Sequence, residues 1–172
     1  MRYLKQVYEK VYHKKAPYYY DYSLGTILMK PIRKWLTNVA AANCPFNCIQ
    51  IFIYRRCGFK IGKSVFIGMR CYLDDMCYDL MTIGDHVMIS YGVYFACHGK
   101  NQGHYPIVIE DHAYIGMRAA VISKNCMGSE GVRIGKQAVV GAFTLVNRDV
   151  PENTCAVGVP CRIKYLSGAD LE

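Results

Sequence analysis

The sequence is poor in the features that mark membrane-spanning, exported or metal-centred proteins. Its most apolar stretch, Trp35 to Tyr54, is broken by asparagines, a proline and a glutamine, so it does not predict a bilayer-spanning helix. The N-terminus lacks the apolar core of a secretory signal peptide. The nine cysteines include no Cys-x-x-Cys pair and no Cys/His pair at zinc spacing. We therefore expect a cytoplasmic protein with reduced thiols and no metal.

Acidic residues are outnumbered, which leaves a formal net charge of +8. Much of the positive charge lies before residue 64, interleaved with apolar residues. This region has no base-reading or base-stacking motif of the kind found in nucleic-acid modules. Phosphate-bearing ligands or an anionic membrane surface fit the charge better than nucleic acid does.

The sequence does contain an apolar residue that returns every six residues. The spacing is 6 within four triplets and 10, 14 and 13 between them. The triplets are Ile61/Ile67/Leu73, Ile83/Ile89/Phe95, Ile109/Ile115/Val121 and Ile134/Val140/Val146. This period matches neither a helix nor a half-buried strand and is typical of a parallel β-helix with three short strands per coil. The sequence predicts a mainly β protein of about four coils.

The remaining hexad positions support the same fold. Glycine often follows the apolar residue, and the fifth position is usually small or β-branched, as tight corners and a narrow interior require. The fifth-position residues are Val65, Cys71, Val87, Val93, Ala113, Ala119, Ala138 and Thr144. We therefore divide the chain into an N-terminal helical extension (1–57), the β-helix (58–151) and a C-terminal cap (152–172) that covers the last coil.

Two helices are predicted in the extension. Residues 2–15 place apolar side chains on one stripe and basic ones elsewhere, which is typical of an amphipathic helix. Such a helix packs on the β-helix or on a neighbouring subunit, or lies on an anionic membrane at the inner face. A second helix is predicted from Pro31 to Ala42, with the proline in its first turn.

A candidate catalytic residue stands where the most polar loop leaves the coils. Insertions fall at one corner, at about Asp75 to Thr82, residues 100–108 and Met127 to Arg133. His98 precedes the middle loop, so a sheet holds its backbone while its side chain can reach a cleft. A neutral imidazole at physiological pH suits a general base that accepts a hydroxyl proton.

The residues around these positions resemble the hexapeptide-repeat acyltransferases, the left-handed β-helix family that includes maltose, galactoside, xenobiotic and cell-surface polysaccharide O-acetyltransferases. The resemblance covers roughly Gly58 to Tyr165. The segments that carry it are Ile83-Gly84-Asp85, the loop after His98, Pro106 to Ile109, Tyr114-Ile115-Gly116, Val140-Gly141-Ala142, Arg148 to Pro151 and Gly158-Val159-Pro160-Cys161-Arg162. The resemblance implies left-handed coils and a homotrimer that binds acetyl-CoA between its subunits.

The resemblance also implies roles for individual residues. His98 corresponds to the histidine that deprotonates the acceptor hydroxyl, and Asp74 matches an acid that orients the base or binds the acceptor. The implied acetyl-CoA contacts are the backbones of Gly141 and Ala142, the phosphate-binding side chains of Arg148 and Arg162, and Tyr114, Gly116 and Pro160. The expected activity is acetyl transfer from acetyl-CoA to a hydroxyl of a saccharide or related acceptor.

Several alternatives remain open. An amino-sugar N-acetyltransferase needs the same base and donor. A γ-type carbonic anhydrase would bind Zn²⁺ through histidines such as His98 and His104, although their spacing departs from that family. A non-catalytic β-helix scaffold is a third possibility. Cys97 beside His98 suggests a nucleophilic pair, but adjacent strand residues point to opposite faces, which argues against an acyl-enzyme.

Overall fold

The computed structural model describes all residues except 1, 14–23, 99–102, 124, 127–128 and 166–172. It divides into two units, Met1–Trp35 and Leu36–Glu172. The first unit contains the helices α1 (Arg2–Tyr12) and α2 (Leu24–Trp35). The second contains the π-helix η2 (Leu36–Ala41), the helix α3 (Asn47–Arg56) and every strand.

The predicted helices are present with one correction. The helix predicted within residues 2–15 is α1. The second helix was predicted to begin at Pro31, which is wrong, because α2 begins at Leu24 and Pro31 lies inside it. Proline lacks the amide proton that the helix needs at an interior position, and the next segment, η2, is a π-helix.

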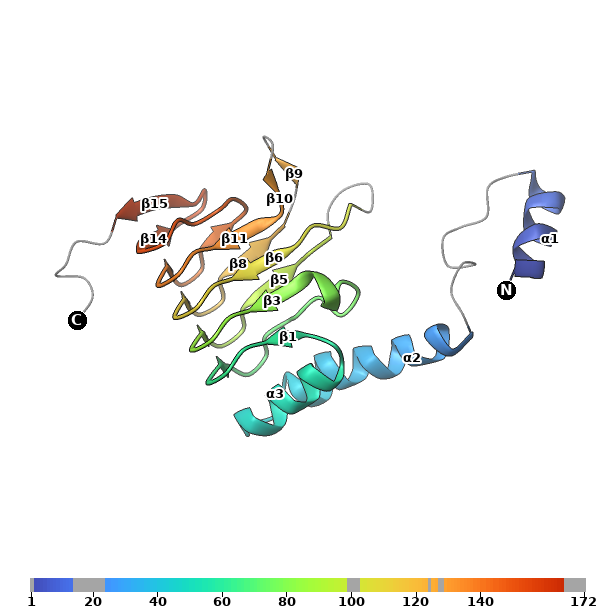
Figure 1. Cartoon of the computed structure of the whole chain (residues 1–172), viewed down its shortest axis with the longest axis horizontal. Coiled ribbons are helices and arrows are strands. Elements are labelled where there is room, and N and C mark those ends of the chain that lie inside the picture. Colours follow the sequence, from blue (N-terminus) through green and yellow to red (C-terminus); the bar gives the residue numbers. More distant parts are fainter. Residues whose placement is uncertain (1, 14–23, 99–102, 124, 127–128, 166–172) are drawn as a thin grey trace. The chain divides into compact units, whose positions relative to one another are not determined.

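The second unit is a parallel β-helix, drawn in Figure 1 as a stack of coils. Its described strands form three parallel stacks, and a bridge from Tyr72 to Tyr94 extends the third stack into the first coil. The first stack is β1 (Lys60–Ile61), β3 (Met81–Ile83), β6 (Ile107–Ile109) and β11 (Val132–Ile134); the second is β2 (Phe66–Ile67), β4 (Met88–Ile89), β7 (Tyr114–Ile115), β12 (Val139–Val140) and β14 (Thr154–Val157); the third is β5 (Tyr94–Ala96), β8 (Ala120–Ile122) and β13 (Leu145–Val146).

The strand register confirms the predicted hexad. Ile83 pairs with Ile61 on one side and with Ile109 on the other, and Ile109 pairs with Ile134. All eight fifth-position residues are buried. Each coil therefore adds one apolar layer to a continuous core.

The corners repeat one backbone conformation. Seven residues that stand three positions after a hexad residue have positive φ although they are not glycine, a region that most side chains avoid. They are Ser64, Arg70, His86, His112, Arg118, Gln137 and Phe143. His86 and His112 stack at one corner with ring centroids 4.9 Å apart. The fold places these residues at turns, as expected from their hexad positions.

The helix α3 closes the first coil, below β1 in Figure 1. Its residue Asn47 pairs with the outermost strand of the second stack, because its amide Nδ2 donates to the carbonyl of Val65 at 2.9 Å and its Oδ1 accepts from the N–H of Ile67 at 3.0 Å. The buried Gln50 donates to the carbonyl of Gly68. Side chains thus replace the missing strand at an edge that would otherwise stay open. The sequence pattern does not predict α3, because its apolar residues lie on several sides of the helix and do not form one stripe.

The other end continues further than the hexad pattern indicated. The sequence predicts that the β-helix ends at residue 151 and that residues 152–172 form a cap. Val150 bridges Ile134, and β14 pairs in parallel with β12, so the coil runs on beyond residue 151. The strand β15 (Arg162–Tyr165) then turns back antiparallel to β14 and caps the sheet. The short step from Val146 to Val150 hid this continuation.

The insertions at the loop corner carry small elements of their own. The first contains the 3-10 helix η3 (Tyr78–Leu80), and the third contains the hairpin β9 (Asn125–Cys126) and β10 (Ser129–Glu130). None of the helices in the described part of the chain has the length and hydropathy needed to cross a membrane.

Replacing Asn47 by alanine removes both hydrogen bonds to the first coil. We expect Asn47→Ala to lower the free energy of unfolding by about 1–3 kcal/mol, because a backbone carbonyl and an N–H lose their partners. Urea denaturation measures the change. The matched control is Asn43→Ala, whose exposed amide bonds only to the carbonyl of Val39 and should cost less than about 0.5 kcal/mol. Equal losses for the two variants would show that Asn47 is not a cap.

Candidate functional site

Stacking of the first two coils brings Asp74 and His98 together. Asp74 follows the last hexad residue of the first coil, and His98 follows β5 in the second. The Oδ2 atom of Asp74 lies 2.6 Å from Nδ1 of His98. The Asp74 side chain is fully buried, whereas that of His98 is 40% exposed. The pair therefore joins a fixed internal carboxylate to an imidazole that solvent can reach.

Backbone groups hold the carboxylate in place. Oδ2 of Asp74 also accepts a hydrogen bond from the N–H of Cys97 at 2.9 Å, and Oδ1 accepts one from Met76 at 3.1 Å. A carboxylate that accepts at Nδ1 favours the tautomer with its proton on that nitrogen. The lone pair of the neutral ring is then on Nε2, which is the arrangement a general base requires.

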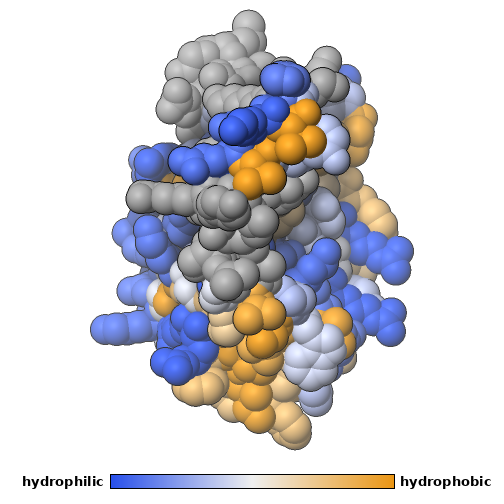
Figure 2. Space-filling model, turned by 90° about the vertical axis from the view of Figure 1, so that its right-hand side faces the viewer, coloured by the Kyte–Doolittle hydropathy of each residue, from blue (hydrophilic) through white to orange (hydrophobic). Residues whose placement is uncertain are grey.

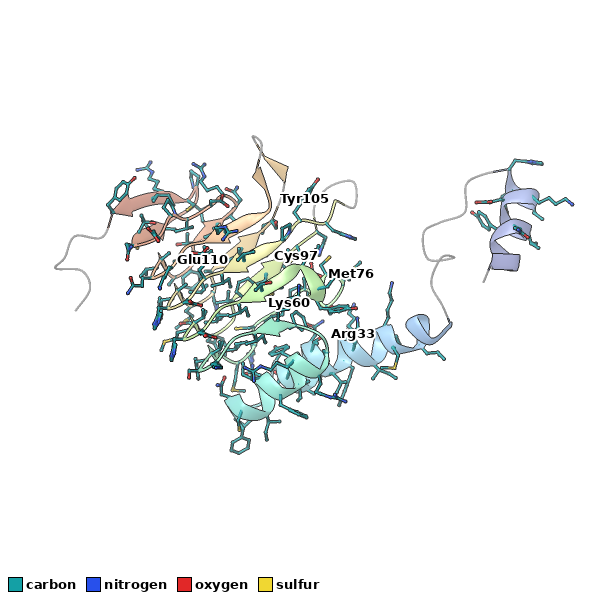
Figure 3. All side chains as sticks on the ribbon, in the orientation of Figure 1. Arg33, Lys60, Met76, Cys97, Tyr105 and Glu110 are labelled. Carbon is teal, nitrogen blue, oxygen red and sulfur yellow. The ribbon has the colours of Figure 1, made fainter. Side chains whose placement is uncertain are left out.

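The backbone of His98 is fixed on its loop side as well. His98 forms an antiparallel bridge with His104, and the N–H of Tyr105 donates to the carbonyl of Cys97 at 2.8 Å. Gly103 allows Tyr105 to approach, because a Cβ at Gly103 would lie 2.7 Å from the tyrosine ring. Figure 3 labels Cys97, Tyr105 and Met76 on this side of the coils. Of the predicted loop 100–108, residues 100–102 lie outside the described part of the chain.

Cys97 belongs to the core and not to the exposed side of the site. It is fully buried, whereas the neighbouring His98 side chain is 40% exposed, which agrees with the prediction that the two point to opposite faces. Burial, and then the carboxylate of Asp74, raise the pKa of the Cys97 thiol to about 12. The thiol is protonated at neutral pH, which removes its nucleophilicity. These features argue against an acyl-enzyme at Cys97.

Two tyrosines that sequence analysis overlooked lie on the same strand positions of the first two coils. Tyr72 and Tyr94 stack with ring centroids 4.6 Å apart. Tyr72 stands two residues before Asp74 in the first coil, and Tyr94 stands two residues before Ala96 in the second. Burial, followed by the charge of Asp74, raises the pKa of Tyr72. Nearby, Asn38 of η2 donates to Asp75 at 2.9 Å. Alignment of the hexads would have revealed the tyrosine pair, since both residues directly precede an apolar hexad position.

The candidate acetyl-CoA residues cluster at a different corner. Gly116 and Gly141 come directly after the neighbouring strands β7 and β12, and Val157, the last residue of β14, pairs with Arg162. These residues therefore form one row across the second sheet, with strands about 5 Å apart. A Cβ at Gly116 would lie 2.6 Å from the N atom of Ala142, so the close approach of the next coil requires glycine. Ala142 itself is exposed at the corner.

The other predicted residues lie around this row. Tyr114 is 40% exposed on β7, and its hydroxyl oxygen accepts a hydrogen bond from the Ser90 hydroxyl at 3.2 Å. Pro160 is exposed in the turn between β14 and β15. Burial raises the pKa of Cys161, and the positive charge of Arg148 opposes that shift.

Within one chain, the candidate catalytic pair and the candidate acetyl-CoA residues lie at different corners of the β-helix. Asp74 and His98 lie where the third sheet leads into the next coil, whereas Gly116, Gly141 and Ala142 lie at the corner between the second and third sheets.

The described residues contain no group of three or more histidine, cysteine, aspartate or glutamate side chains arranged to bind a metal ion. The bridge between His98 and His104 is a backbone contact.

Comparison with known proteins gives this arrangement a class. No protein-family model matches the chain. A hexapeptide-repeat acetyltransferase from Vibrio cholerae has a similar structure, with a TM-score of 0.61 at 25% identity over 83% of this chain and 92% of that one. A second structure of the Vibrio protein, complexed with acetyl-CoA, also has a TM-score of 0.61, at 24% identity over 84% of this chain and 91% of that one. The fold is therefore that of the hexapeptide-repeat acetyltransferases, and the predicted left-handed parallel β-helix is confirmed.

Relatives in sequence are also acetyltransferases. The chain is 31% identical over 122 residues to galactoside O-acetyltransferase of Escherichia coli. This match covers 61% of this chain and 55% of that protein. It is 34% identical over 116 residues to serine acetyltransferase of Bacillus licheniformis, covering 66% of this chain and 49% of that protein. The chain thus spans about half the length of these curated relatives. The predicted resemblance to hexapeptide-repeat acyltransferases is confirmed.

The raised pKa of Cys97 predicts a thiol that resists alkylation. At pH 8 only about one thiol in 10⁴ would be ionised at a pKa of about 12, so iodoacetamide should leave Cys97 unmodified in the folded protein. The exposed Cys48 is the internal reference and should react readily. Peptide mass spectrometry after a timed reaction measures both. Modification of Cys97 at a rate similar to that of Cys48 would contradict its burial and protonation.

Proposed function

We propose that this protein is an acetyl-CoA-dependent O-acetyltransferase in which His98 is the general base. The observation that carries the proposal is the 2.6 Å contact between the exposed His98 ring and the buried Asp74 carboxylate. The acetyltransferase relatives and the acetyl-CoA complex of the Vibrio protein support the donor and the reaction. The galactoside O-acetyltransferase relative favours a hydroxyl acceptor.

The proposed reaction is a direct transfer. Nε2 of His98 accepts the proton of the acceptor hydroxyl as its oxygen attacks the thioester carbonyl. The carbon–sulfur bond then breaks, and the sulfur of CoA receives the proton from His98. Asp74 holds the ring and stabilises the imidazolium that forms between these steps. Asp74 acts through His98 in this scheme and is a positioning residue.

The donor is proposed to lie along the row formed by Gly116, Gly141 and Arg162. Small residues there leave room for a pantetheine arm beside the exposed backbone at Ala142, and Tyr114 and Pro160 border the row. Arg148 and Arg162 supply guanidinium groups for phosphate oxygens, with which they form paired charge-assisted hydrogen bonds. Because one chain places this row and His98 at different corners, we propose a homotrimer in which each site uses two subunits.

The proposed acceptor is a saccharide or a related hydroxylated compound. Transfer to an amino sugar needs the same base and donor, so a panel of sugars, amino sugars and sugar nucleotides distinguishes O- from N-acetylation. The cytoplasm, at or near the inner face of the membrane, is the proposed location.

Replacement of His98 tests the base. We expect His98→Ala to lower kcat by about 10²–10⁴-fold, while CoA binding is retained, because only proton transfer is lost. Release of CoA from acetyl-CoA across the acceptor panel gives the rate, and a CoA titration gives the affinity. Asp74→Asn should lower kcat with little change in KM for the acceptor. His104→Ala is the control and should keep the wild-type rate. Unchanged turnover in His98→Ala would overturn the proposal.

Replacement of the two arginines tests the donor site. Arg148→Ala and Arg162→Ala should each raise the Kd for CoA by about 10- to 100-fold, since a charge-assisted hydrogen bond to a charged group contributes roughly 1.5–3 kcal/mol. The control is Lys164→Ala, two residues along the exposed strand β15, which should leave the Kd within about twofold. Calorimetric titration with CoA measures all three. If the lysine variant lost as much affinity, the contribution would be net charge and not a built phosphate site.

A further inference from the structure

The helix α3 is apolar on both of its faces, although the coils cover only one. Gln50, Ile51 and Tyr54 are buried against the first coil. On the other side Phe52 is 64% exposed and Ile49 is 47% exposed, and Phe46, which precedes the helix, is 63% exposed. An exposed cluster of large apolar side chains beside polar ones often marks a surface that binds a partner or a membrane. Figure 1 draws α3 at the lower end of the coils, and Figure 2 shows where apolar residues reach the surface in a view from one side.

The chain that contains α3 carries charge of one sign in sequence, and the nearby carboxylate of Asp85, from the second coil, accepts a hydrogen bond from the backbone N–H of Lys63 at 2.6 Å. From residue 22 to residue 73 the sequence contains no aspartate or glutamate and eight lysines and arginines. Arg55, Arg56, Lys60 and Lys63 follow the apolar face directly along the chain and are exposed. Arg55 donates to the carbonyl of Ile61 at 3.2 Å, which fixes its charge at the end of α3. The helix α2, considered by itself, has the same composition, with exposed Leu28, Met29, Ile32 and Trp35 among basic residues.

We propose that the outer face of α3 and the basic residues after it bind the surface of an anionic lipid membrane. Exposed phenylalanine and isoleucine side chains enter the boundary between headgroups and acyl chains, and the basic side chains meet the negative headgroups. A second copy of this chain is the poorer occupant, because its α3 would bring the same positive charge to the contact. The inference is independent of the proposed reaction.

The position of α3 makes this contact compatible with an accessible catalytic site. The helix lies at one end of the coils, and β14 and β15 lie at the other (Figure 1). A membrane that contacts α3 therefore leaves the C-terminal end, with Arg148 and Arg162, in solution. This location would bring the enzyme to acceptors that are themselves held at a membrane.

Vesicle sedimentation tests the proposal with the full chain. The probes are vesicles of phosphatidylcholine alone and vesicles that also contain about 30% phosphatidylserine, which gives them a negative surface. We expect the wild-type protein to sediment with the anionic vesicles and to be released by salt. The double variant Ile49→Ser/Phe52→Ser should bind the anionic vesicles at least about 10-fold more weakly than wild type. Arg56→Gln should bind them about fivefold more weakly, because it loses one basic side chain near the negative surface.

Matched controls separate this face from others. Phe143→Ser removes a ring that is 61% exposed in the fourth coil, and Val7→Ser/Val11→Ser removes exposed apolar residues of α1. Both should bind like wild type, and thermal unfolding should show that the exposed α3 residues do not support the fold. Absence of vesicle binding by wild type, full binding by the α3 variant, or loss of binding only in the α1 variant would overturn the proposal. Lipid-free self-association that the α3 variant abolishes would overturn it in favour of a second copy.

Discussion

Parallel pairing of each coil with the next is the constraint on which the rest of this structure depends. A hexad residue lies directly over its counterpart in the coil before, as Ile83 lies between Ile61 and Ile109. Because strands of two or three residues have little stability of their own, the corners must return the chain at the same angle every time. The repeated positive φ at corner residues, from Ser64 to Phe143, meets that requirement. Side chains between the coils are limited to apolar or small residues for the same reason.

The candidate catalytic pair follows from this stacking. Asp74 and His98 are 24 residues apart in sequence. The first insertion, at about Asp75 to Thr82, lies between them along the chain, yet the two residues are neighbours in space because they belong to consecutive coils. The same register that pairs Tyr72 with Tyr94 brings the carboxylate beside the imidazole. Regular packing thus supplies a rigid base, while the loops that leave at this corner are free to vary. A buried carboxylate that accepts backbone N–H groups keeps its geometry without extra support.

The two ends of the stack face a different problem, because each exposes an unpaired sheet edge. At the C-terminal end the chain solves it with β15, which turns back on β14. At the N-terminal end Asn47 and Gln50 of α3 supply side-chain hydrogen bonds in place of a strand. A helix that caps in this way needs an apolar inner face. The apolar outer face of α3 is not required for the cap and is therefore available to bind another surface.

The sequence by itself determined the coil, because a six-residue apolar period with small or β-branched residues at the fifth position matches neither a helix nor a half-buried strand, and it predicted His98 as the base and α1 as a helix. It misplaced the start of α2 at Pro31 and missed α3, since apolar residues on all sides of a helix leave no single stripe to detect. It also ended the repeats early, since the step from Val146 to Val150 breaks the spacing. Only the tertiary structure decided that Asp74 contacts His98, that Cys97 is buried, and that the base and the Gly116–Gly141 row lie at different corners. Those relations depend on which residues stack between coils, and insertions of unequal length conceal this in the sequence.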